Sequence, residues 1–289
     1  MITRSRASYV SAPTRVALLS LKSHHSGMDD AHIDSRHLLL LSNSWNSGEG
    51  FLSHAQEWID ELFGNVRNLF VIDFAVVTES GIGSYAKQYL VNRGYEVTMA
   101  SECRDQIAAL KDAGGVFTLG GNTFLLLRKI QDHGLETPLR DFVRSGRPYL
   151  GASAGTNLAC PTIMTTNDMP ISEPKGFSAL GLIGIQVNTH YIGEREYANH
   201  AGETRQERLQ QFVLQSGRPV FCLPEGDGLA VNGSRVELLG PKEAYFLSDT
   251  NEFIPVAPGM INEPLNSHFA FEQSAQVAPQ VVLNKPPNT

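Results

Sequence analysis

Short apolar runs alternate with amphipathic segments along this 289-residue chain, and this alternation limits the possible folds more than any other feature. The apolar runs are short and bounded by Asn, Gly or Asp, as buried parallel strands are; they lie at residues 38–41, 69–77, 116–119 and 149–150. The segments between them carry apolar residues at helical spacing and cover residues 50–63, 84–93, 103–113, 123–133 and 139–145. This order predicts an α/β fold with a mainly parallel sheet that helices cover on both faces.

The second half of the chain continues the pattern. Residues 182–187 and 220–223 are expected to extend the same sheet, and residues 203–214 are expected to form a helix. Residues 229–231 and 236–239 flank an Asn-Gly pair, which predicts a β-hairpin. An antiparallel edge on a parallel core is therefore expected.

The composition of the two ends predicts where the folded part begins and stops. Residues 1–35, with several serines and arginines and few acids, are expected to be a disordered or targeting-like extension. Residues 259–289, rich in Pro, Asn and Gln, are expected to be a flexible tail. One catalytic α/β domain is expected over residues 36–258, because no linker interrupts them.

Charge and cysteine content exclude several classes of protein. The net charge of -7 gives no basic footprint, so nucleic acid and anionic membranes are not expected partners. No apolar run approaches the roughly 18 residues of a transmembrane span. Cys103, Cys160 and Cys222 are widely spaced without a C-x-x-C pair. This usage argues against a disulfide framework or a zinc site, and it predicts a reducing compartment, the cytoplasm. No cofactor is expected.

The segment Gly151-Ala-Ser-Ala-Gly155 has the G-x-S-x-G spacing of a nucleophile elbow, a sharp turn from a strand into a helix. Small neighbours would let the backbone fold back closely and lift the Ser153 hydroxyl above the sheet. The amides of Ala154 and Gly121 would then form an oxyanion hole, since Gly121 lies in a glycine turn after another strand. Asn122 is expected to cap the following helix and to line the substrate site.

A serine nucleophile needs a base, and the base needs an acid that holds it in one tautomer. His190 follows an expected strand at residues 185–189, level with Ser153, and is the best base among nine histidines. Glu225, in a Pro/Gly turn after a strand, and Asp168, in a loop after the nucleophile, can each be drawn beside it. We expect Glu225 to orient His190, because their strands should be neighbours, and Asp168 to contact the substrate. The sequence alone leaves both assignments open.

Several motifs occur in the order typical of one family. They are residues 38–44, 120–124, 151–171, 188–190, 202–205 and 223–226. Together they resemble peptidase E, the alpha-aspartyl dipeptidase family of serine peptidases, over about residues 37–245. The resemblance implies a three-layer α/β/α sandwich related to class I glutamine amidotransferases, and cleavage of dipeptides that begin with aspartate. It also implies Ser153, His190 and Glu225 as the triad and Asp168 as a further essential acid.

An enzyme for such dipeptides must bind a side-chain carboxylate and a free amine. The planar fork of arginine matches a carboxylate, and Arg205 is the candidate by chemistry and by the resemblance, although it can also belong to an exposed charged helix face. Asp168 can bind the amine or support His190. The alternative function is a cyanophycinase-like exopeptidase acting on an aspartate-containing polymer, which the Asn167-Asp-Met-Pro170 segment disfavours. The expected partner is a small Asp-Xaa peptide, and the chain is expected to be a monomer or homodimer.

Overall fold

The computed structural model describes residues 34–77, 81–193, 202–248 and 252–271. The expected N-terminal extension lies outside the described residues up to residue 33, and the expected tail does so from residue 272. Among the helices of the described segments, none has both the length and the apolar character needed to cross a bilayer.

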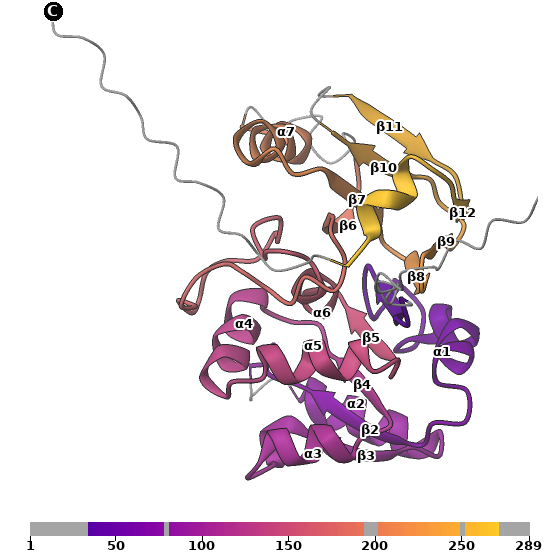
Figure 1. Cartoon of the computed structure of the whole chain (residues 1–289), viewed down its shortest axis with the longest axis vertical. Coiled ribbons are helices and arrows are strands. Elements are labelled where there is room, and N and C mark those ends of the chain that lie inside the picture. Colours follow the sequence, from indigo (N-terminus) through magenta and orange to yellow (C-terminus); the bar gives the residue numbers. More distant parts are fainter. Residues whose placement is uncertain (1–33, 78–80, 194–201, 249–251, 272–289) are drawn as a thin grey trace, which may run out of the picture. The chain divides into compact units, whose positions relative to one another are not determined.

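The larger sheet combines a parallel core with an antiparallel edge (Figure 1). In the described residues it has eight strands in the order β12-β9-β8-β1-β5-β4-β2-β3. The parallel strands are β1 (His37–Leu41), β2 (Asn68–Ile72), β3 (Glu96–Met99), β4 (Gly115–Thr118) and β5 (Tyr149–Ala152). The antiparallel strands are β8 (Gly228–Asn232), β9 (Arg235–Leu239) and β12 (Gly259–Ile261). The protein therefore has a mixed α/β fold, with the expected hairpin formed by β8 and β9.

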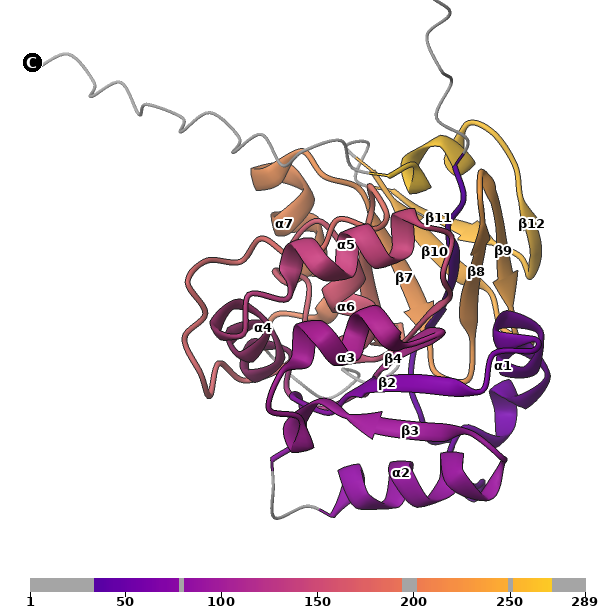
Figure 2. The same ribbon diagram turned by 60° about the horizontal axis from the view of Figure 1, so that its bottom comes forward.

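Side chains of the larger sheet alternate between two hydrophobic clusters. In β1, Leu38 and Leu40 belong to one cluster, whereas Leu39 and Leu41 belong to the other. The cluster of Leu39 contains residues of α1 (Gln56–Phe63) and α2 (Ile82–Asn92). The cluster of Leu38 contains residues of α3 (Gln106–Asp112), α4 (Thr123–Asp132), α5 (Glu136–Arg144) and α6 (Ala154–Ala159). Because successive strand side chains point to opposite faces, the helices cover both faces; Figure 2 shows α2 and α3 on opposite sides of β2 and β3. Short 3-10 helices precede α1 and α3, at Ser53–Ala55 and Ala100–Glu102.

A second, four-stranded sheet in the described residues has the order β11-β10-β7-β6. Its strands are β6 (Gln186–Tyr191), β7 (Val220–Pro224), β10 (Ala244–Leu247) and β11 (Phe253–Val256). The expectation that residues 182–187 and 220–223 extend the larger sheet is therefore wrong: β6 pairs in parallel with β7, and β7 pairs with β10. The position beside β1 is already occupied by β8 of the hairpin, so these strands assemble separately. Helix α7 (Arg205–Ser216) packs on this sheet.

Folded structure continues past residue 258, where a flexible tail is expected. Strand β12 pairs with β9, and a 3-10 helix at Leu265–Phe269 follows it. Phe269 is buried with its ring centroid 5.6 Å from that of Phe221, and its main-chain oxygen accepts a hydrogen bond from Arg36. The expected boundary after residue 258 is too early, because the two buried residues of this polar stretch, Ile261 and Phe269, are too far apart to give a periodic signal.

Candidate active site

Ser153 lies between the end of β5 and the start of α6, with φ 51° and ψ -106°. A positive φ is uncommon for a residue other than glycine and marks a strained turn. The turn depends on close backbone approach on both sides. A Cβ at Gly151 would lie 2.7 Å from the Gly155 carbonyl, and a Cβ at Gly155 would lie 2.3 Å from the Thr118 oxygen. Small residues are therefore required around Ser153.

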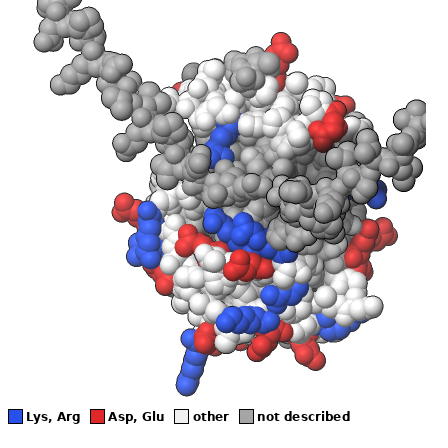
Figure 3. All heavy atoms as spheres, in the orientation of Figure 1, with Lys and Arg blue, Asp and Glu red and all other residues white. Residues whose placement is uncertain are grey.

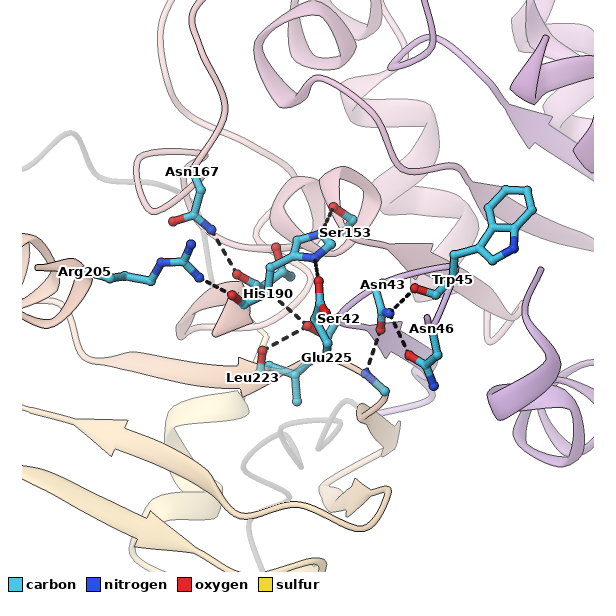
Figure 4. A network of polar contacts seen from close by, with 12 residues as sticks. Ser42, Asn43, Trp45, Asn46, Ser153, Asn167, His190, Arg205, Leu223 and Glu225 are labelled. Carbon is cyan, nitrogen blue, oxygen red and sulfur yellow. Dashed lines mark hydrogen bonds and ion pairs between the residues drawn. The ribbon is translucent and has the colours of Figure 1, made fainter. Parts of the chain in front are cut away.

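Ser153, His190 and Glu225 form a continuous hydrogen-bonded chain (Figure 4). The Ser153 Oγ lies 2.8 Å from His190 Nε2, and His190 Nδ1 lies 2.8 Å from Glu225 Oε1. His190 belongs to β6, and Glu225 directly follows β7, so the second sheet supplies these two residues while the first supplies Ser153. An ionised Glu225 favours the tautomer with the proton on Nδ1, which leaves Nε2 to accept the serine proton.

His190 lies inside a strand rather than after one. The pairing of β6 with β7 shifts register between Asn188 and Tyr191, which indicates a β-bulge, and His190 has φ 55° within it. Its main-chain amide donates to Ser42 Oγ at 2.8 Å. The bulge turns the imidazole toward the first sheet.

Asp168 lies in the segment between α6 and β6 and hydrogen-bonds the first residue of α4. Its Oδ2 accepts hydrogen bonds from the amide of Thr123 at 2.8 Å, from the Thr123 hydroxyl at 2.6 Å and from the Thr166 hydroxyl at 2.9 Å. Among the described residues, it is Glu225 and not Asp168 that contacts the imidazole of His190. Asp168 thus supports the turn that carries Asn122 and the start of α4.

Of the two expected oxyanion donors, Ala154 directly follows Ser153, and Gly121 belongs to the same glycine turn as Gly120. A Cβ added to Gly120 would lie 3.3 Å from Ser153 Cβ, so the glycine turn packs directly against Ser153. The adjacent Gly121 has φ 138° and approaches the Ala75 carbonyl so closely that no side chain fits. Ala154 is the first residue of α6, and an amide in the first turn has no acceptor within its helix. Asn122 caps α4 through Leu125 N and donates to the Met169 carbonyl.

Arg205 is the first residue of α7, after a capping box of Thr204 and Glu207. One of its Nη1 protons is donated to the main-chain oxygen of His190 (Figure 4). Arg205 also lines a pocket of about 150 Å³ together with Arg208, Asn167 and Asn188. The two guanidinium groups make this pocket suited to an anion such as a carboxylate.

Sequence reasoning missed the supporting roles of Ser42 and Asn43. Ser42 Oγ contacts the amide of His190 and donates to the Leu223 carbonyl at 2.9 Å. Asn43 Oδ1 accepts from the amide of Gly226 at 2.7 Å. The available signal was their position at the carboxyl end of β1, where polar side chains of an α/β sheet gather around ligands.

Charged groups elsewhere give a mixed surface. Lys and Arg side chains are interspersed with Asp and Glu over the face shown in Figure 3.

Near the site, Asp227 is fully buried, and burial raises the pKa of its carboxyl group to about 6. The amide and ammonium of Lys242 oppose this rise.

Residues 38–239 match the sequence model described as Peptidase family S51. The chain belongs to peptidase family S51. The S51 match includes Ser153, His190 and Glu225 and ends before β10, β11 and β12. The resemblance to the peptidase E family inferred from the sequence is thereby confirmed.

Curated relatives in this family are similar over most of their length. A "Probable alpha-aspartyl dipeptidase" of Drosophila melanogaster is 39% identical over 229 residues, covering 77% of this chain and 95% of the relative. "Peptidase E" of Streptomyces coelicolor is 41% identical over 207 residues, covering 72% of this chain and 85% of the relative. "Peptidase E" of Escherichia coli is 40% identical over 225 residues, covering 77% and 98%.

Two solved structures share the fold. A putative peptidase E protein from Listeria monocytogenes has a TM-score of 0.55 at 19% identity, covering 71% of this chain and 98% of the other. A peptidase from an acI-B1 actinobacterium has a TM-score of 0.59 at 15% identity, covering 80% and 98%. At such identities the likeness concerns the fold, a mixed α/β sheet with flanking helices.

Proposed function

We propose that this S51 chain is a serine dipeptidase that hydrolyses Asp-Xaa dipeptides through an acyl-enzyme. The observation that carries the proposal is the continuous chain from Ser153 through His190 to Glu225, with 2.8 Å between each pair of bonded atoms. The printed names of its relatives, alpha-aspartyl dipeptidase and peptidase E, support the substrate class. They favour this function over a cyanophycinase-like exopeptidase.

In the proposed reaction, Ser153 Oγ attacks the carbonyl carbon of the aspartyl residue while His190 Nε2 takes the hydroxyl proton. Glu225 holds the Nδ1 proton and stabilises the imidazolium that forms. His190 then gives the proton to the departing amine, leaving an aspartyl ester on Ser153. Water, activated by the same imidazole, hydrolyses this ester and restores the serine.

The oxyanion of each tetrahedral intermediate would be held by the amides of Gly121 and Ala154. Each such donor is worth about 3 kcal/mol of transition-state stabilisation.

We interpret the positive φ of Ser153, between a strand and a helix, as a nucleophile elbow. We interpret the helices on both faces of the larger sheet as the outer layers of a three-layer α/β/α sandwich related to class I glutamine amidotransferases.

Recognition of the substrate aspartate is assigned to Arg205, because it lines an anion-suited pocket and also bonds the His190 carbonyl. The role of Asp168 in binding the substrate amine stays a prediction. Its three hydrogen bonds at the start of α4 support a second role in holding the turn that carries Gly121.

A cytoplasmic location is proposed because the cysteine thiols are free. A monomer or homodimer stays the expected assembly.

The direct test is hydrolysis of Asp-Leu, Leu-Asp and N-acetyl-Asp-Leu by the purified chain. Only Asp-Leu should be cleaved, since the site is proposed to need both the aspartate side chain and the free amine. Ser153→Ala should remove activity by about 10⁶-fold with an unchanged unfolding transition. Cleavage of Leu-Asp at a comparable rate would refute the substrate assignment, and an active Ser153→Ala variant would refute the serine mechanism.

A further inference from the structure

Three consecutive residues at the carboxyl end of β1 each hold the main chain of one part of the triad. The Leu41 oxygen accepts a hydrogen bond from the amide of Ser153 at 3.0 Å. Ser42 Oγ accepts from the amide of His190 at 2.8 Å. Asn43 Oδ1 accepts from the amide of Gly226, the residue after Glu225, at 2.7 Å. One short segment therefore contacts all the elements that must be aligned.

The Ser42 contact occurs where the ladder between β6 and β7 is interrupted. Asn188 pairs with Cys222 and Tyr191 pairs with Pro224, so the bulge separates the His190 amide from the ladder. Ser42 receives that amide and donates its own hydroxyl proton to the Leu223 carbonyl at 2.9 Å. A hydroxyl from the first sheet thus connects, across the bulge, the two strands that carry the base and the acid.

Solvent cannot replace this hydroxyl without a rearrangement. Ser42 has no exposed surface, and its own amide donates to the Asp227 carbonyl at 3.0 Å. Asn43 is fixed in the same way, because its Nδ2 donates to the Trp45 carbonyl and to Asn46 Oδ1, which leaves Oδ1 for Gly226. Figure 4 shows Ser42 and Asn43 beside His190 and Glu225. The contacts with Leu223 and Gly226 therefore hold the main chain on either side of Glu225.

We propose that Ser42 is a positioning residue that sets the orientation of His190 toward both Ser153 and Glu225. This inference rests on the proposed function, since it assigns Ser42 to the same triad. Both imidazole nitrogens bond at 2.8 Å, so a small rotation of the His190 main chain would lengthen one bond or both. Its backbone is in a positive φ conformation that surrounding contacts must hold in place.

The test is a double-mutant cycle with Asp-Leu as substrate. Ser42→Ala should lower kcat by about 10- to 100-fold, as expected for misplacement of a catalytic group, with KM little changed. In a Glu225→Gln background, where His190 is already poorly held, the same Ser42→Ala change should lower kcat by less than about threefold. An equal fold-loss in both backgrounds would overturn the proposal, because Ser42 would then act independently of the His190–Glu225 pair.

Thr162→Val is the matched control. It removes a hydroxyl that bonds Gln186 at the opposite end of β6, so it tests loss of a strand contact without touching His190. Its kcat should stay within about threefold of the parent. Ser42→Thr, which keeps the hydroxyl, should restore most of the activity lost in Ser42→Ala. If Ser42→Thr does not fold, the double-mutant cycle still tests the proposal, because it uses only Ser42→Ala, Glu225→Gln and their combination.

A second readout separates this inference from the proposed function. The rate at which a fluorophosphonate labels Ser153 reports nucleophile activation without any peptide. If the parent chain is labelled but does not cleave Asp-Leu, the substrate assignment fails, and Ser42→Ala must still slow labelling for the alignment role to hold. If Ser42→Ala is labelled as fast as the parent, the alignment role is wrong even when Asp-Leu is a substrate.

Discussion

His190 Nδ1 lies 2.8 Å from Glu225 Oε1, and the two residues come from neighbouring parallel strands, β6 and β7. The carboxyl ends of parallel strands meet at one edge of a sheet, so a base near the end of one strand and an acid just after the next are brought together by the fold itself. Ser153 reaches the same point from β5 of the larger sheet. The proposed triad is therefore assembled where the ends of the two sheets meet.

Glu225→Gln should lower kcat for Asp-Leu by up to about 10⁴-fold, because a carboxamide no longer stabilises the imidazolium or fixes the productive tautomer. Folding should be unaffected, since the glutamate side chain is 48% exposed. Steady-state kinetics and a thermal unfolding scan provide the measurement. Glu243→Gln, the same chemical change at an exposed position beside β10, is the control and should leave kcat unchanged. A Glu225→Gln variant as active as this control would remove Glu225 from the triad.

Asp168 offers a test that separates support from substrate binding. Asp168→Ala removes three hydrogen bonds at the start of α4 and should lower the free energy of unfolding by about 1–3 kcal/mol. Asp168→Asn keeps an acceptor oxygen but loses the charge, so it should chiefly raise KM for Asp-Leu, with kcat changed less than about tenfold. Asp105→Ala removes a comparable cap from α3 and should lower stability without affecting KM. An unchanged KM in Asp168→Asn would leave Asp168 with the supporting role alone.

The parallel core could be predicted because its strands are buried on both faces and read as continuous apolar runs. Strands β3 and β11 could not be predicted from the sequence. β3 has the sequence Glu-Val-Thr-Met with only its last residue buried, and β11 contains Pro255 and no buried residue. Edge strands of this kind have neither an apolar run nor a clean alternation. The second sheet was missed for a related reason, since periodicity indicates a strand but not which neighbour it pairs with.

Within the site, the spacing of Gly151-Ala-Ser-Ala-Gly155 is local and could be interpreted directly. The contacts of Ser42 are not local, because its partners His190 and Leu223 lie 148 and 181 positions away. In the sequence, a serine that follows a buried strand gives the same pattern whether its hydroxyl faces solvent or connects two other strands. The bulge at His190 likewise follows from pairing with β7, which no single segment reveals.

Arg205 should determine the preference for aspartate over its uncharged analogue. Arg205→Lys removes the planar fork, so kcat/KM for Asp-Leu should fall by about 10- to 100-fold while kcat/KM for Asn-Leu changes much less. The ratio of the two substrates is the measurement, because it cancels any general effect of the lost contact with the His190 carbonyl. Arg93→Lys, an exposed arginine paired with Asp60, is the control and should keep the parent ratio. An unchanged ratio in Arg205→Lys would locate aspartate recognition elsewhere.

The buried carboxyl group of Asp227 predicts an unusual pH dependence of stability. Its Oδ2 accepts a hydrogen bond from the Lys242 amide at 3.2 Å, whereas Oδ1 is buried with no partner among the described residues. Burial raises its pKa from 3.8 to about 6, against the opposing amide and charge of Lys242. Between these pH values the folded chain binds more protons at this site than the unfolded chain does. The contribution of Asp227 to stability is therefore fully present below about pH 4 and is lost as the pH rises through about 6.

Asp227→Asn keeps the size and the acceptor for the Lys242 amide but removes the ionisable group. Its free energy of unfolding should exceed that of the parent by about 3 kcal/mol at pH 7.5, and the difference should disappear by about pH 4. Urea unfolding of both proteins at several pH values gives the measurement. Asp132→Asn is a control of opposite sign, because Arg128 lowers the pKa of Asp132, so that variant should lose stability at neutral pH and none at low pH. If the difference between parent and Asp227→Asn does not vary with pH, Asp227 does not titrate in the folded protein over this range, and its burial carries no ionisation penalty.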